Sequence, residues 1–160
     1  MNIMYEPIGI IHTGMKEREG TPIQSTFGSE HRGRVELYEQ YVEGLCDLDG
    51  FSHAYLLFHF HKSSGFSLKV RPFLDETERG VFATRAPRRP NPIGLSIVTI
   101  LGIEGNTVNF SGVDILDGTP LLDIKPYIGD FDTRGDIRTG WAEPAIKNNQ
   151  RRHADDRFSE

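Results

Sequence analysis

Short apolar segments, bounded by turn-forming residues and recurring about every ten residues, constrain this chain more than any other feature. Segments of this kind are typical of antiparallel strands in a barrel or sandwich, and they disfavour an alternation of strands and helices. The dipeptides Gly105-Asn106 and Asp117-Gly118 favour tight turns. The sequence therefore predicts a short helix or turn at 41–48 and strands at 8–11, 34–38, 51–62, 68–73, 81–84, 94–101, 107–110, 113–116 and 121–127.

The length of 160 residues favours one domain with a core of its own. We predict a single-domain, all-β, mainly antiparallel fold over residues 1–138, a barrel or a sandwich with short helices. Residues 139–160 are polar and of mixed charge, and they are predicted to be a C-terminal tail with at most a short helix. A single cysteine, Cys46, excludes an internal disulfide framework. The N-terminus does not resemble a secretory signal, and no apolar stretch is long enough to span a membrane. We therefore expect a soluble, cytoplasmic protein with no membrane partner.

Positive charge gathers in one part of an acidic chain. The segment from Lys69 to Pro92 carries six basic and three acidic residues, a net charge of +3, whereas the whole chain has −5. Within it, the loop RAPRRPNP at 85–92 combines three arginines with three prolines. Proline rigidity lowers the entropy that a loop loses on binding, and arginine suits phosphate or carboxylate. The loop is either an anion-binding loop or a stiff connection whose arginines pair with Asp75, Glu76 or Glu78.

The histidines of FSHAYLLFHFHK at 51–62 form a second candidate site. In a strand, alternate residues share a face, so His53, His59 and His61 would lie together. The other face, predicted to be core, would consist of Ala54, Leu56, Phe58 and Phe60. Two imidazoles on one face can bind a metal ion, but they can equally line a polar groove. No third ligand lies close in sequence, so we predict no metal.

Aspartates cluster around a predicted turn in DILDGTPLLDIKPY at 114–127. Asp117 is either a turn former or a ligand-binding carboxylate. Asp123 and Lys125 share one face of a strand, where they can pair with each other. The motifs of dinucleotide-binding loops, P-loops, HExxH metalloproteases and GxSxG hydrolases are all absent from the sequence.

Four ordered blocks together resemble the TsaA-like, or TrmO, family of tRNA methyltransferases. The blocks are TPIQ at 21–24, GLCDLDGFSHAYLLFHFHK at 44–62, RGVFATRAPRRPNPIGLS at 79–96 and DILDGTPLLDIKPY at 114–127. The resemblance implies a β-barrel that binds S-adenosylmethionine, as a homodimer with the cofactor near the subunit interface. It also implies N6-methylation of N6-threonylcarbamoyladenosine, next to the anticodon of certain tRNAs.

The resemblance also implies a set of cofactor-binding residues. They are Pro22, Ile23, Gln24, His61, Lys62, Arg85, Leu95, Ile115, Leu116, Asp117 and Gly118. Among these, Arg85 is suited to grip the methionyl carboxylate, and Asp117 is suited to accept hydrogen bonds from the ribose or the ammonium group. Leu95 and Leu116 are suited to cover the adenine.

Methyl transfer needs alignment of donor and acceptor, and a group that takes the proton from the acceptor nitrogen. His61, His59 and Asp123 are the candidate bases. Arg88 and Arg89 are predicted to contact phosphates or stacked bases of the RNA, and Asn91 a base edge. Two other functions stay open: a non-catalytic RNA-binding barrel that uses the arginine loop, and a metal-dependent hydrolase that uses His59 and His61.

Overall fold

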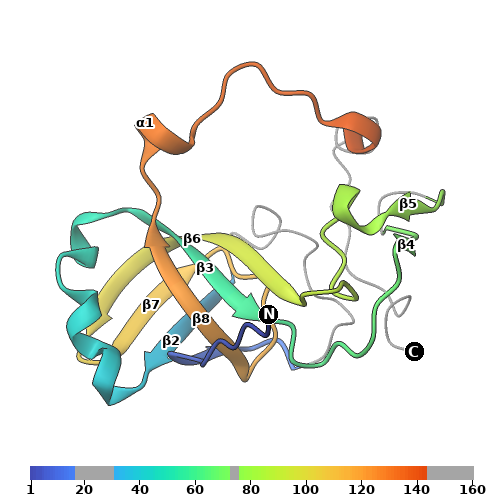
Figure 1. Ribbon diagram of the computed structural model, residues 1–160. Coiled ribbons are helices and arrows are strands. Elements are labelled where there is room, and N and C mark those ends of the chain that lie inside the picture. Colours follow the sequence, from blue (N-terminus) through green and yellow to red (C-terminus); the bar gives the residue numbers. More distant parts are fainter. Residues whose placement is uncertain (17–30, 73–75, 144–160) are drawn as a thin grey trace.

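A computed structural model describes residues 1–16, 31–72 and 76–143 of the chain. Six antiparallel strands close into a barrel in the order β1-β2-β7-β6-β3-β8 (Figure 1). These strands are β1 (Gly9–Thr13), β2 (Arg32–Leu37), β3 (His53–His59), β6 (Ile93–Glu104), β7 (Thr107–Ser111) and β8 (Thr119–Pro126). Pairing of Gly9–Ile11 with Thr119–Leu121 closes the barrel. The predicted all-β, mainly antiparallel, barrel-like fold is confirmed.

Buried apolar side chains alternate with more exposed ones along the strands, and the buried ones fill the barrel interior. In β3, Ala54, Leu56 and Phe58 are buried, whereas His53 and Tyr55 are only half-buried. A barrel of this size has an interior narrow enough for side chains to fill. Each fully buried aliphatic or aromatic side chain stabilises the fold by about 1.5–3 kcal/mol. The core cluster comprises Ile11, Val35, Leu37, Leu45, Leu48, Leu56, Phe58, Val98, Val108, Phe110, Val113, Ile115 and Leu121.

A two-residue turn at the predicted Gly105-Asn106 dipeptide joins the neighbouring strands β6 and β7. Gly105 has φ of +59°, a conformation that glycine adopts without a steric penalty. Asn106 Nδ2 donates to the Leu37 carbonyl at 3.0 Å, which ties the turn to β2. Two short 3-10 helices, η1 (Glu39–Leu45) and η2 (Leu48–Gly50), follow β2 and agree with the predicted helix or turn at 41–48.

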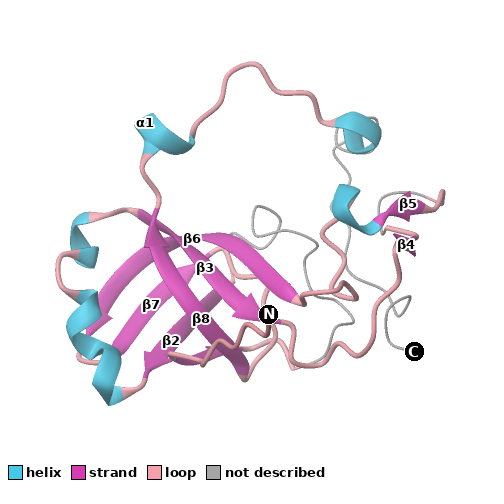
Figure 2. Ribbon diagram, viewed as in Figure 1, coloured by secondary structure: helices cyan, strands magenta, loops and turns pink. Residues whose placement is uncertain are grey.

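A second, smaller unit lies beside the barrel. The strands β4 (Lys69–Val70) and β5 (Arg79–Gly80) form a two-stranded sheet next to the 3-10 helix η3 (Val81–Ala83), as Figure 2 shows. After the short helix α1 (Gly129–Asp132), the chain returns to this unit at the 3-10 helix η4 (Gly140–Ala142) (Figure 1). There Trp141 Nε1 donates to the Ala83 carbonyl at 2.8 Å. The described start of the predicted tail is therefore attached to η3, and the domain boundary at residue 138 stays a prediction.

Several predicted strands differ from the structure. The strand at 81–84 is wrong: the segment is η3, where the Thr84 hydroxyl donates to the Val81 carbonyl at 2.9 Å. The strand at 113–116 is also wrong, because this apolar segment is buried as an irregular loop. The predicted strand at 51–62 is shorter, at His53–His59, and the described part of the one at 68–73 is a strand only at Lys69–Val70, with residue 73 outside the described residues. Within the described ranges, no helix has the length and apolar character needed to cross a membrane.

Candidate active site

A pocket of about 570 Å³ opens between one end of the barrel and the loop that follows η3. Its size falls in the usual range for small-molecule and cofactor sites. The lining residues come from the ends of β3 and β6, the start of β8 and three loops. They are Phe58, Phe60, His61, Lys62, Phe82, Thr84, Arg85, Pro87, Arg89, Pro90, Asn91, Ile93, Gly94, Leu95, Ser96, Asp114, Ile115, Leu116 and Thr119.

Apolar side chains form much of the pocket wall. Phe58 is buried, and its ring packs edge-on against Phe60 with centroids 5.4 Å apart. Ile115 is buried on the wall contributed by the 113–118 loop. Gly94 faces Phe58 across β6 and β3, and the absence of a side chain at Gly94 leaves room for the ring. Such a wall suits the flat face of a heterocycle.

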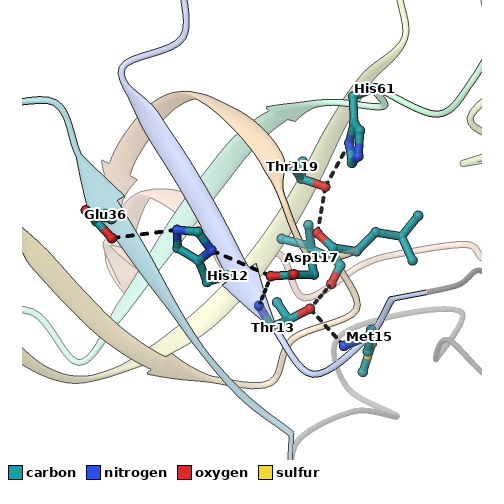
Figure 3. Close-up of polar contacts among 9 residues, drawn as sticks. His12, Thr13, Met15, Glu36, His61, Asp117 and Thr119 are labelled. Carbon is teal, nitrogen blue, oxygen red and sulfur yellow. Dashed lines mark hydrogen bonds and ion pairs between the residues drawn. The ribbon is translucent and has the colours of Figure 1, made fainter.

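Two buried hydroxyl groups add polarity to this wall. Ser96 and Thr119, 4% and 3% exposed, are the only buried polar or charged residues among the described ones, and both line the pocket. Ser96 Oγ donates to Asp114 Oδ1 at 2.5 Å. Thr119 Oγ1 lies 3.2 Å from His61 Nδ1 and donates to the Leu116 carbonyl at 2.7 Å (Figure 3). Each buried hydroxyl therefore contacts a titratable side chain of the pocket.

Cationic side chains occupy the loop side of the pocket. Arg85 and Lys62 are exposed, and Arg89 is half-buried. Arg89 Nη1 donates to the Thr84 carbonyl at 3.1 Å and the Ala86 carbonyl at 3.3 Å, so its guanidinium closes the loop onto itself. Arg85 offers a planar, permanently charged fork that suits a carboxylate or phosphate.

Hydrogen bonds from β1 fasten the loop before β8 from behind. The Thr13 N–H donates to Asp117 Oδ1 at 3.0 Å, and the Thr13 hydroxyl donates to the Ile115 carbonyl at 2.9 Å (Figure 3). The bond from the Thr13 N–H, with His12 and Lys16 nearby, holds the pKa of Asp117 below its usual range, although desolvation opposes this effect. His12 Nδ1 lies 3.6 Å from the same oxygen. These contacts fix the loop that presents Ile115 and Leu116.

The structure brings together many, but not all, of the predicted site residues. Those that line the pocket are His61, Lys62, Arg85, Arg89, Asn91, Leu95, Ile115 and Leu116. Asp117 and Gly118 are not among the lining residues, and Asp117 faces β1. Arg88 does not line the pocket either. Pro22, Ile23 and Gln24 lie outside the described residues.

The three candidate bases separate. β3 ends at His59, and the chain then turns, with the His61 N–H donating to the His59 carbonyl at 2.8 Å. His61 lines the pocket, whereas His59 does not, so the predicted shared face of the histidines does not extend to His61. Asp123 also lies away from the pocket and pairs with Lys125 at 2.9 Å. In the described part of the chain, no three His, Cys, Asp or Glu side chains are grouped so that they could hold a metal ion.

Sequence reasoning missed Ser96, Asp114, Thr119 and Phe82. Ser96 could have been predicted from the sequence. It is a polar residue in the apolar run GLSIVTIL, at a position on the strand face that points into the barrel. Asp114 was noted only as one of several aspartates near a turn. Phe82 is 75% exposed at the pocket, which no sequence pattern indicates.

Comparison with known proteins places the chain in a family. Residues 10–133 match the sequence profile of the tRNA-methyltransferase O N-terminal domain. The chain belongs to the tRNA-methyltransferase O family. The resemblance predicted from the four sequence blocks is therefore confirmed, and the pocket lies within the matched region.

Individual relatives agree with this family. A probable S-adenosyl-L-methionine-binding protein of Pyrococcus abyssi is 47% identical, over 98% of this chain and 85% of its own length. The human tRNA (adenine(37)-N6)-methyltransferase is 36% identical, over 93% of this chain and 35% of its own length. A crystal structure of TrmO from Pseudomonas aeruginosa is 41% identical with a TM-score of 0.75, over 89% of this chain and 63% of that one. The chain thus spans about a third of the human relative and less than two thirds of the TrmO crystal structure.

Proposed function

We propose that this protein is an S-adenosylmethionine-dependent methyltransferase that modifies N6 of the adenosine at position 37 of tRNA, next to the anticodon. The pocket carries the proposal: in a member of this family, it joins an apolar wall to titratable side chains and a cationic loop. The names of the relatives support both the cofactor and the reaction. One is a probable S-adenosyl-L-methionine-binding protein, and another is a tRNA (adenine(37)-N6)-methyltransferase.

The described residues fit the chemical parts of S-adenosylmethionine. Leu95, Leu116 and Phe60 offer apolar contact for an adenine ring. Arg85 suits the methionyl carboxylate, and Asp114, which accepts from Ser96 through Oδ1, suits the ammonium group. When bound, the cofactor supplies a methyl group on an electrophilic sulfonium. The chain has to hold the acceptor nitrogen in line, exclude water and receive a proton.

His61 is the proposed acceptor of that proton, since it lines the pocket and the other two candidate bases do not. For Asp117 and Gly118 we propose an indirect role, in which they hold the loop that contacts the cofactor. The acceptor nitrogen is a poor nucleophile when it carries a threonylcarbamoyl group, so the removal of its proton matters. We propose N6-threonylcarbamoyladenosine as the substrate base, because Arg89 provides the pocket with a second cation, besides Arg85, for its additional carboxylate.

The same loop is proposed to contact the tRNA. Arg88, Arg89 and Asn91 stay the predicted RNA contacts, and the exposed ring of Phe82 adds a surface on which a base can stack. Arg89 donates two hydrogen bonds to carbonyls of the loop itself, so it shapes the loop as well as adding positive charge. The proposed substrate places the protein in the cytoplasm.

We also propose that the protein forms a homodimer through the outer face of β3 and β6. Ile93, Leu95 and Ile97 project from β6 and are 39%, 53% and 40% exposed. Leu57 and Tyr55 lie opposite Leu95 and Ile97 on β3, so the apolar surface continues across two strands. A contiguous apolar surface of this kind is typical of a protein interface. Because Ile93 and Leu95 also line the pocket, a second copy would place the cofactor near the interface.

The dimer is tested by Ile97→Glu, with Ile137→Glu as a control at an exposed isoleucine outside β3 and β6. Sedimentation equilibrium should give a dimer for the parent and the control, and a monomer for Ile97→Glu. A monomeric parent at micromolar concentration would contradict the homodimer.

The function is tested in two steps with protein freed of carried-over cofactor. Calorimetric titration should detect S-adenosylmethionine binding, with competition by S-adenosylhomocysteine. Methyl transfer is then measured on tRNA with and without the threonylcarbamoyl group. Transfer to the modified tRNA alone supports the full proposal, and transfer to both supports a broader adenosine substrate. Salt-dependent tRNA binding without any cofactor binding would instead favour a non-catalytic RNA-binding barrel.

A further inference from the structure

The hydroxyl of Thr119 has an unusual position, because it is buried between a carbonyl and an imidazole. Thr119 begins β8 and is 3% exposed. Its Oγ1 lies 2.7 Å from the Leu116 carbonyl oxygen and 3.2 Å from His61 Nδ1 (Figure 3). A hydroxyl has one proton to donate and lone pairs to accept with, whereas a carbonyl oxygen only accepts. The proton of Thr119 therefore goes to Leu116, and Oγ1 can only accept from the histidine.

We propose that Thr119 is a positioning residue that keeps a proton on Nδ1 of His61, so that Nε2 is the nitrogen that gains and loses a proton. Neutral imidazole carries one N–H, and the hydrogen bond made by one ring nitrogen decides which one carries it. Because free histidine prefers the proton on Nε2, the Thr119 contact reverses the ordinary preference. The nitrogen of His61 that can act as a base is thereby assigned.

The environment holds this arrangement in place. Thr119 is 3% exposed, so little of its surface is open to water. The carbonyl of Leu116 belongs to the loop that β1 fastens, through the bonds from Thr13 to Asp117 and to the Ile115 carbonyl. The Gly118 N–H also donates to the Ile11 carbonyl at 2.9 Å. Rotating the Thr119 hydroxyl toward His61 would leave the Leu116 carbonyl without its 2.7 Å hydrogen bond, which disfavours that orientation.

The consequence for the reaction rests on the proposed function. As the acceptor nitrogen forms its new bond to carbon, the electron pair of the breaking carbon–sulfur bond stays on sulfur. The N–H proton of the acceptor passes to Nε2, which gives an imidazolium, and water later removes that proton. The opposite tautomer would present an N–H at Nε2 and could not accept the proton. Thr119 thus selects the form of His61 that is competent as a base.

The decisive measurement is the tautomer itself, read by long-range ¹H–¹⁵N correlation spectra of protein labelled at histidine. The chain has six histidines, and a His61→Gln variant identifies the relevant signals. The parent should show protonated Nδ1 and unprotonated Nε2 for the neutral ring. Thr119→Val removes the hydroxyl at nearly constant shape, and it should shift the ring toward the Nε2–H form. Thr119→Ser keeps a hydroxyl and should retain the parent spectrum.

Kinetics give a second, separate result. Thr119→Val should lower kcat by about tenfold or more, within the range of general-base effects, whereas the affinity for S-adenosylmethionine changes little. Thr119→Ser should recover most of the activity. A parent spectrum with Nε2–H would overturn the inference, even for an active enzyme. A parent with Nδ1–H and no methylation of any tRNA would leave the tautomer assignment standing and contradict the proposed function. The parent spectrum decides the assignment even if Thr119→Val does not fold.

Discussion

Gly94 controls how tightly the pocket wall is packed, and Gly94→Ala tests that packing directly. A Cβ at this position would lie 2.2 Å from Cε2 of Phe58 and 2.4 Å from Cζ. Nonbonded carbons prefer about 3.5–4.0 Å, so the ring has to move by more than about 1 Å. Phe58 is only 4% exposed and packs edge-on against Phe60, so the displacement passes to a second aromatic ring.

Overpacking of this kind costs about 1–3 kcal/mol, and the severity of the contact favours about 2–3 kcal/mol. For a domain of this size, the melting temperature should fall by roughly 4–12 °C. Both displaced rings line the pocket, so the affinity for S-adenosylmethionine should fall as well. Differential scanning calorimetry measures the first effect, and isothermal titration measures the second.

A matched control comes from Gly102 on the same strand, where an added Cβ meets nothing within 4 Å. Gly102→Ala should stay within about 0.5 kcal/mol of the parent. Truncating the ring in Gly94→Ala/Phe58→Leu should recover part of the stability lost by Gly94→Ala alone, which gives a coupling energy of the expected sign. Equal melting temperatures for Gly94→Ala and Gly102→Ala would refute the close packing of Gly94 against Phe58.

Three further substitutions probe the loop and the charges of the pocket. The bond from the Thr13 N–H lowers the pKa of Asp117 in the folded state. Ionised Asp117 therefore stabilises the fold fully at pH values above its ordinary pKa of 3.8, and this contribution is lost as the pH falls through the lower folded pKa. The melting temperatures of the parent and Asp117→Asn, measured against pH, should therefore differ most at neutral pH and converge as the pH falls through the lowered folded pKa of Asp117. Arg85→Ala should weaken S-adenosylmethionine binding by about 1–3 kcal/mol in calorimetry, and an unchanged affinity would remove Arg85 from the cofactor site. Asp114→Asn should also weaken cofactor binding while the hydrogen bond to Ser96 is kept, and equal affinities would contradict a contact between Asp114 and the ammonium group.

Strand alternation made the all-β, antiparallel class predictable from sequence, whereas the choice of a barrel over a sandwich came from the family resemblance. In HAYLLFH, buried and half-buried residues alternate as expected for one face on a core. The two short apolar runs on either side of Gly105-Asn106 likewise form the β6–β7 hairpin. This hairpin could be predicted because the conformation of a tight turn depends on the residues in the turn itself. Local patterns of this kind are decided by neighbouring residues and can be read without knowledge of the fold.

The segment at 113–116 shows where local reading fails. Val113 and Ile115 are 0% and 2% exposed, so their apolar character is real, but it reflects burial in the core and not pairing in a sheet. The carbonyl of Ile115 is bonded by the hydroxyl of Thr13, which lies 102 residues earlier. No local pattern reports such a partner, and an apolar run of four residues is compatible with either structure.

His61 illustrates a related limit at the end of a strand. A period of two predicts a shared face only while the strand continues, and β3 stops at His59. The turn that follows carries His61 to the pocket, where Thr119 contacts its ring. The sequence therefore offered His59 and His61 as equivalent candidate bases, and the point where the strand ends separates them.

The turns and strands described above also determine where the polar and charged groups of the pocket lie. The buried hydroxyl of Ser96 fixes Asp114, and the buried hydroxyl of Thr119 fixes His61. Asp114 and the neutral form of His61 then each offer a hydrogen-bond acceptor. The exposed cations of the pocket are Arg85, from the loop that follows η3, and Lys62. A ligand with a cationic and an anionic end has one favourable orientation between them, whereas a purely anionic ligand would meet the acceptors unfavourably. We therefore expect the pocket to bind a zwitterionic small molecule more favourably than a bare phosphate, although the arginine-rich loop alone suits either.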